Sequence, residues 1–141
     1  EIYTLSLHDA LPISTSQNEI LIDDAKTIVA SGAKYVCEGS NMSSSNEAIE
    51  YMLYNGIILG PSKAANAGGV ACSCIEMGQN SGKTVFTPDQ VHAQLKDIMV
   101  NIHDAAKNAA EEYGYGYNLV AGANIAGFIK VADSMIAQGC V

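Results

Sequence analysis

The chain has 141 residues, a length that suits one compact domain. Hydrophobic residues make up 48% and charged residues 16% of the sequence, which is typical of a folded globular unit and excludes a disordered tail. The formal charge of -8, with only 7 Lys and Arg residues, disfavours binding to a nucleic-acid backbone or an anionic membrane surface. We therefore expect neither nucleic acid nor a membrane as a partner.

Two further patterns bear on location and metal binding. No uninterrupted apolar run approaches the roughly 20 residues that a membrane span needs, and the first segment lacks the basic start of a signal peptide. The cysteines form no CxxC pair, and no His lies at metal-ligand spacing from any of them: Cys37, Cys72, Cys74 and Cys140. These patterns predict a cytoplasmic protein with reduced thiols and no metal site.

The opening segment, residues 1–14, differs in character from the rest of the chain. It follows neither a helical nor a strand period for long, and the pattern changes abruptly at Thr15. It looks like translated adaptor sequence joined to a genuine reading frame, so we leave it out of the fold prediction.

Regular patterns begin at residue 19. Apolar residues recur at helical spacing up to Gly32, and residues 34–38 (KYVCE) are typical of a short buried strand. Ser44 and Glu47 have the spacing of a capping box, which predicts a second helix that ends at residues 55–56. A second strand follows at residues 57–59. This alternation predicts an α/β fold with a parallel sheet, whose ligands bind at the carboxyl ends of the strands.

The remainder of the chain is predicted to be helical. Helical periodicity covers residues 70–79, 88–112 and 119–138, and Pro88 fits the first turn of its helix. The last helix places small residues about four apart, a pattern that favours close helix packing over chemistry: Gly122, Ala123, Ala126 and Gly127.

The segment from residue 63 to residue 73 (KAANAGGVACS) combines a strand end, two glycines and a helix start. Gly68 and Gly69 lack Cβ atoms and would let a ligand approach the backbone, while amides at the helix start favour an anion. Ser73 is one turn further on the same face and can donate a hydrogen bond, and Asn66 suits a carboxamide or ribose hydroxyl. An ordinary tight turn, in which Asn66 caps the helix, explains the same residues equally well.

Other polar residues carry weaker signals. Asn41, in the loop after residue 38, is interpreted as an ordinary turn residue. Lys63 is interpreted as a solvated residue, with a cation beside the anion site as the alternative. His92 and His103 lie on the long helix as surface or packing residues. No acidic residue has a His or Lys partner at a catalytic spacing, and no GxGxxG loop is present, so no complete active site is expected in the chain.

Several motifs, taken together, closely resemble one enzyme family. They are QNE at residues 17–19, EGSNM at 38–42, NEAIEY at 46–51, GPSKAANAGGV at 60–70, EMGQNS at 76–81 and AGANIAGF at 121–128. All six resemble hexameric, small-subunit glutamate dehydrogenases, in register and without a large gap from residue 17 to the end.

The resemblance implies the fold and the chemistry. Residues 15–141 would form the second half of a Rossmann-like cofactor domain followed by C-terminal helices, as a C-terminal fragment of a homohexameric enzyme. The implied reaction is the reversible oxidative deamination of L-glutamate to 2-oxoglutarate and ammonia, with NADP, or NAD, as the hydride acceptor. The family's catalytic lysine and aspartate lie in sequence that the chain does not contain, so the fragment alone is expected to be inactive.

The resemblance also implies substrate contacts. Ser73 matches the serine that hydrogen-bonds the side-chain carboxylate of glutamate, and Val70 matches a residue that lines the same pocket. Two departures from the family are mild, since Ser43 stands where many relatives have proline, and Cys72 and Cys74 flank Ser73 where small or hydroxyl residues are usual.

Cofactor contacts follow from the same resemblance. Asn41 and Asn66 match asparagines near the nicotinamide and its ribose, and Gly68 and Gly69 match the pair that gives access to the backbone. The choice between NADP and NAD is made where the absent strands meet the adenosine ribose.

Two alternative functions remain at the level of the sequence. A standalone, non-catalytic module for nucleotide binding or assembly would need a closed sheet within these residues. A related dehydrogenase of apolar amino acids would need a residue without a hydroxyl at position 73, so Ser73 favours glutamate.

Overall fold

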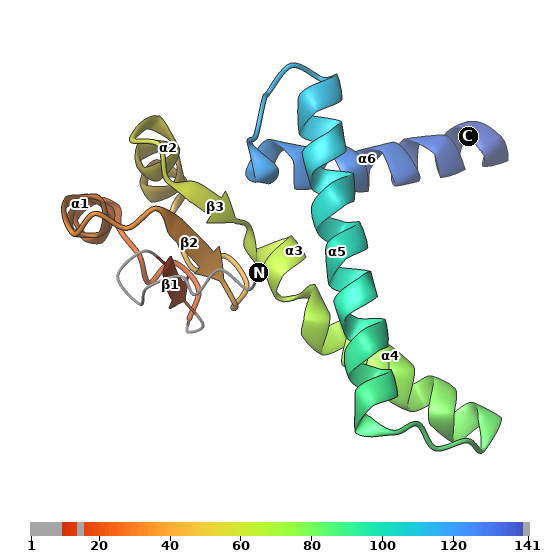
Figure 1. Ribbon diagram of the computed structural model, residues 1–141. Coiled ribbons are helices and arrows are strands. Elements are labelled where there is room, and N and C mark those ends of the chain that lie inside the picture. The colour runs from red at the N-terminus through yellow and green to blue at the C-terminus, as the bar shows by residue number, and fades with distance from the viewer. Residues whose placement is uncertain (1–9, 14–15, 140–141) are drawn as a thin grey trace.

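A parallel sheet forms the first half of the computed structural model, which describes residues 10–13 and 16–139. Strands β1 (Ala10–Ile13), β2 (Tyr35–Glu38) and β3 (Ile58–Gly60) lie in the order β1-β2-β3 (Figure 1). Helices α1 (Ile22–Ala30) and α2 (Asn46–Tyr54) connect them. The predicted α/β class with a parallel sheet is therefore confirmed.

The sheet buries one face under these two helices. Val36 and Leu59 are register partners, so their side chains lie on the same face of neighbouring strands. Both are almost fully buried, in a core cluster completed by apolar residues of the helices and the turn before β3: Ala25, Ala48, Met52 and Ile57. The alternation of strand side chains turns Cys37 to the opposite face, where it is partly buried and part of its surface remains exposed.

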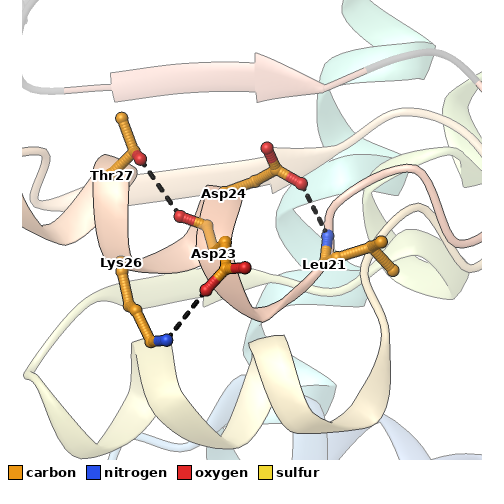
Figure 2. Close-up of polar contacts among 5 residues, drawn as sticks. All are labelled: Leu21, Asp23, Asp24, Lys26 and Thr27. Carbon is orange, nitrogen blue, oxygen red and sulfur yellow. Dashed lines mark hydrogen bonds and ion pairs between the residues drawn. The ribbon is translucent and has the colours of Figure 1, made fainter.

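The first turn of α1 shows why the sequence starts a helix there (Figure 2). A carboxylate oxygen of Asp24 accepts a hydrogen bond from the backbone N–H of Leu21 at 3.0 Å, which satisfies an amide that the helix leaves free. Asp23 pairs with Lys26 at 2.8 Å on the solvent side. The hydrogen bond and charge of Lys26 lower the pKa of the Asp23 carboxyl, but full exposure leaves this ion pair little effect on stability.

Two local predictions are wrong. Ser44 was predicted to cap α2, but the cap is Ser45, whose hydroxyl accepts a hydrogen bond from the N–H of Ala48 at 3.3 Å. Ser44 is buried, and its own N–H donates to the carboxylate of Glu38. Residues 10–13 form β1 because they find a parallel partner in β2, although the segment was left out of the fold prediction. Residues 1–9 and 14 lie outside the described residues, and the adaptor-like origin of the segment stays a prediction.

Four helices make up the second half: α3 (Ser62–Ala65), α4 (Ala67–Gly82), α5 (Pro88–Glu112) and α6 (Leu119–Gln138). The start of α5 is fixed by a capping box, in which Thr87 and Gln90 each accept a hydrogen bond from the other's backbone N–H. Pro88 occupies the first turn, as predicted. The predicted bounds of α5 and α6 are confirmed, whereas α4 begins three residues before the predicted start at Val70.

Helix α6 crosses α5 near the C-terminal end of α5 (Figure 1). A Cβ atom on Gly122 would lie 1.8 Å from the carbonyl oxygen of Ala106 and 3.0 Å from Cβ of Ala110, so only glycine permits this crossing. The prediction of close packing is confirmed at Gly122. At Gly127 an added Cβ would meet no described atom within 4 Å, so the described part of the chain shows no close packing there.

Much of α6 faces solvent. Phe128, Val131, Met135 and Ile136 are exposed, and within the described part of the chain α6 alone has the length and apolar composition of a membrane span. Those two properties are weak evidence for a span, since helices that pack against other protein parts share them. The expectation that the chain has no membrane partner stays a prediction.

Candidate functional site

The loops that follow β2 and β3 meet at one edge of the sheet, where parallel strands present their carboxyl ends. Asn41 lies in the loop after β2, and Asn66 links α3 to α4 after β3. The side-chain N–H of Asn66 donates to the side-chain oxygen of Asn41 at 2.6 Å. Two residues 25 positions apart in sequence, both predicted as cofactor contacts, are thus brought together.

A buried carboxylate links the two loops that carry this pair. Glu38, the last residue of β2, is only 2% exposed. One of its oxygens accepts from the backbone N–H of Ser44 at 2.9 Å, and the other accepts from the N–H of Ser62 at 3.2 Å. A buried carboxylate needs such donors because burial removes its water. Glu38 therefore joins the loop after β2 to the first residue of α3.

Serine hydroxyls add hydrogen bonds to this junction between the loop after β2 and the start of α3. Ser62 accepts a hydrogen bond from the N–H of Met42 at 3.3 Å, a second link between the two loops. Inside the first loop, the hydroxyls of Ser40 and Ser43 share a hydrogen bond of 2.5 Å. Ser43 is fully buried.

The two glycines of the predicted ligand-binding loop lie in the first turn of α4. Gly68 has a packing reason, because a Cβ atom there would lie 3.4 Å from the sulfur of Met99 in α5. A Cβ atom on Gly69 would meet no described atom within 4 Å, so this side of the turn is open. Of the predicted glycine pair, the structure leaves Gly69 accessible.

Ser73 and Val70 share this open side of α4. The Ser73 hydroxyl donates to the carbonyl of Gly69 at 3.2 Å, one turn back, and Val70 is 68% exposed. A serine hydroxyl can rotate from such a bond to donate to a ligand. Asn66 holds the N-cap position of α4, as the tight-turn alternative expected, but its side chain makes no cap hydrogen bond there and is directed to Asn41 instead.

The backbone around Asn66 is already hydrogen-bonded. The N–H of Asn66 donates to Ser62 at 2.9 Å, and the N–H of Gly69 donates to the carbonyl of Asn66 at 3.2 Å. Because α3 runs almost directly into α4, these amides are used inside the protein and are not free for an anion. The amides of Asn66 and Gly69 are therefore not available to an anion, and the Ser73 hydroxyl is a donor on the open face of α4.

The contact between Lys63 and Asn124 was not predicted from the sequence. The Lys63 ammonium donates to the side-chain oxygen of Asn124, which anchors α6 to the corner between β3 and α3. Lys63 is thus not simply solvated. Both residues lie in motifs shared with glutamate dehydrogenases, GPSKAANAGGV and AGANIAGF, and that membership was the available signal.

A hollow lies beside the junction. Its walls come from both strand-end loops, α2 and the start of α6: Glu38, Met42, Ser44, Asn46, Ile49, Pro61, Ser62, Lys63, Val120 and Asn124. The hydroxyl of Ser44 is buried here without a hydrogen-bond partner among the described residues. A water molecule is the smallest group that would satisfy it.

Two further titratable side chains, those of His103 and Cys37, contact other parts of the protein. His103 contacts the Tyr117 hydroxyl at 2.7 Å and Asp104 at 3.0 Å, which confirms its interpretation as a surface or packing residue. The Cys37 sulfur lies against Gly60, and burial, with a smaller effect of the Glu38 charge, raises the pKa of this thiol. Within the described residues, no three His, Cys, Asp or Glu side chains gather as metal ligands.

Comparison with known proteins decides the family. The model of the glutamate/leucine/phenylalanine/valine dehydrogenase family matches residues 1–139. The chain belongs to this dehydrogenase family. Its place in the family agrees with the six motifs and with the strand-end junction.

Relatives from this family are similar over almost the whole chain. NAD-specific glutamate dehydrogenase of Clostridium symbiosum is 48% identical over 130 residues, which are 92% of this chain and 29% of the relative. NADP-specific glutamate dehydrogenase of Escherichia coli K12 is 46% identical over 139 residues, 99% of this chain and 31% of the relative. The chain thus spans about 30% of the length of the curated relatives it matches.

Solved structures agree with this assignment. The crystal structure of Plasmodium falciparum glutamate dehydrogenase superposes with a TM-score of 0.89 at 46% identity, covering 94% of this chain and 29% of that one. The hetero-hexameric glutamate dehydrogenase of Thermus thermophilus has a TM-score of 0.80 at 21% identity, which supports the fold alone.

Proposed function

We propose that this dehydrogenase chain serves as the C-terminal part of an NAD(P)-dependent glutamate dehydrogenase. The observation that carries the proposal is the 2.6 Å contact between Asn41 and Asn66, which unites the two predicted cofactor contacts at the carboxyl edge of a parallel sheet. The relatives from Clostridium symbiosum and Escherichia coli are glutamate dehydrogenases, which supports the same activity. The reaction is the reversible oxidative deamination of L-glutamate to 2-oxoglutarate and ammonia.

In this proposal the chain contributes binding and positioning. Ser73 donates to the side-chain carboxylate of glutamate, and Val70 lines the same pocket, which fits their shared open face on α4. Asn41 and Asn66 orient the nicotinamide end of the cofactor, and Gly69 leaves room for its approach. The lysine and aspartate that carry out the chemistry come from the remainder of the enzyme, which supplies hydride transfer through the bound cofactor.

The sheet is interpreted as the second half of a Rossmann-like domain. The strand order β1-β2-β3, with each strand parallel to the next, supports this interpretation. NADP is the proposed cofactor, with NAD possible, since relatives of both specificities are similar to the chain to nearly the same degree. A homohexameric assembly and a cytoplasmic location complete the proposal.

Glutamate is preferred over an apolar amino acid because Ser73 offers a hydrogen-bond donor to a carboxylate. The test is a hybrid enzyme in which the whole chain replaces the matching stretch of the Escherichia coli relative. We expect reduction of NADP⁺ with glutamate and much less with leucine or valine. A hybrid that folds but favours leucine, or that oxidises neither amino acid, would contradict the proposal.

A further inference from the structure

We propose that Glu38 is a positioning residue, which holds Asn41 and Asn66 in the relative placement that the cofactor requires. The inference rests on the proposed function for the role of that pair. Glu38 itself is almost fully buried. It acts through the backbone of the two loops that carry the asparagines.

Glu38 differs from an ordinary buried residue in the hydrogen bonds that it accepts. Its two carboxylate oxygens accept from different loops, Ser44 on one side and Ser62 on the other. Asn41 lies three residues before Ser44, and Asn66 lies one helical turn after Ser62, whose carbonyl accepts the N–H of Asn66 at 2.9 Å. A shift of either loop therefore moves one asparagine relative to the other.

The carboxylate is suited to this task because both of its oxygens are acceptors. A glutamine at position 38 would present one acceptor and one NH₂ group, so one of the two backbone N–H groups would lose its partner. The donors that reach Glu38 are two backbone amides, those of Ser44 and Ser62. The two loops are therefore held by directional hydrogen bonds.

Substitution of Ser62 tests the link without touching the buried carboxylate. Ser62 is the first residue of α3, where proline is tolerated, and Pro61 has φ -68 and ψ 146, the conformation that a following proline requires. Ser62→Pro removes the N–H and the hydroxyl, whereas Ser62→Ala removes the hydroxyl alone. The difference between the two variants isolates the hydrogen bond to Glu38.

The first measurement is the KM for NADP⁺ in the hybrid enzyme. We expect Ser62→Pro to raise this KM about tenfold relative to Ser62→Ala, as the loss of one charge-assisted hydrogen bond predicts, with a smaller change in the KM for glutamate. In an Asn66→Ala background the ratio should fall close to one, because the residue being positioned is gone. A tenfold ratio in both backgrounds, or a ratio of one in both, would overturn the positioning role.

A second measurement does not depend on catalysis. In crystal structures of the hybrid enzyme, the 2.6 Å contact between the side chains of Asn66 and Asn41 should be lost in Ser62→Pro and kept in Ser62→Ala. An unchanged contact in both variants would overturn the inference. An Asn66→Ala hybrid with an unchanged KM for NADP⁺ would instead contradict the proposed function, so the two failures are distinguishable.

Discussion

At the scale of single residues, Ser73 carries the substrate part of the account. Its hydroxyl donates to Gly69 at 3.2 Å on an exposed face, an arrangement from which it can turn to a ligand. In the hybrid enzyme, Ser73→Ala should raise the KM for glutamate by about tenfold or more, because a charge-assisted hydrogen bond of roughly 1.5–3 kcal/mol is lost.

A matched control exists in the same chain. Ser134 makes the same kind of bond to a carbonyl one turn back, that of Lys130, at 2.8 Å on an exposed part of α6. Ser134→Ala should leave the KM for glutamate unchanged. An equal KM for the Ser73→Ala variant and the parent would remove Ser73 from the substrate site.

Cys37 gives a prediction about pH. Because burial raises the pKa of the folded thiol, the unfolded chain loses this proton at a lower pH than the folded chain does. The contribution of the protonated Cys37 thiol to the free energy of unfolding is therefore fully present below the ordinary thiol pKa. It is lost as pH rises through the pKa of the thiol in the folded chain. Chemical denaturation at increasing alkaline pH should show a steeper loss of stability for the parent chain than for Cys37→Ala; equal slopes would contradict the shift.

At the scale of elements, the crossing of α5 and α6 depends on one glycine. Gly122→Ala would force a Cβ atom onto the backbone of Ala106, which cannot move as a side-chain end can, so we expect a loss of about 3 kcal/mol. Gly127→Ala is the control, since the added methyl group meets open space, and better helix propensity should stabilise α6 by about 0.5–1 kcal/mol. Thermal unfolding compares them, and equal melting temperatures would contradict the crossing.

The elements also show what local sequence could predict. The bounds of α5 were predicted because Pro88 marks the first turn and the apolar period runs within the helix itself, so both signals are local. Strand β1 was missed because its stability comes from pairing with β2, 25 residues away in the register, which no local pattern reveals. The start of α4 was placed too late because Gly68 and Gly69 were interpreted as loop residues, whereas packing against Met99 explains Gly68.

The candidate site also has a part that the sequence predicted and a part that only the fold shows. The motifs identified the asparagines, but only the fold reveals that Asn41 and Asn66 touch. Glu38 was dismissed for lack of a His or Lys partner, since a sequence does not show that backbone amides will surround a carboxylate. Long-range contacts of this kind require the folded chain.

At the scale of the whole molecule, the sheet and the long helices leave much apolar surface uncovered. Large apolar side chains are exposed on α4, α5 and α6, among them Met77, Val100 and Phe128. The chain on its own should therefore bind a hydrophobic dye and unfold over a broad temperature range. A sharp, cooperative transition without dye binding would contradict the idea that these surfaces pack against other parts of an enzyme.

The central claim is that this chain completes a glutamate dehydrogenase. The most direct measurement is the glutamate-dependent reduction of NADP⁺ by three samples: the hybrid, the chain alone, and the Escherichia coli enzyme without its matching stretch. We predict turnover in the hybrid alone, because each part holds residues that the other needs. An inactive but folded hybrid, or activity in the isolated chain, would contradict the account.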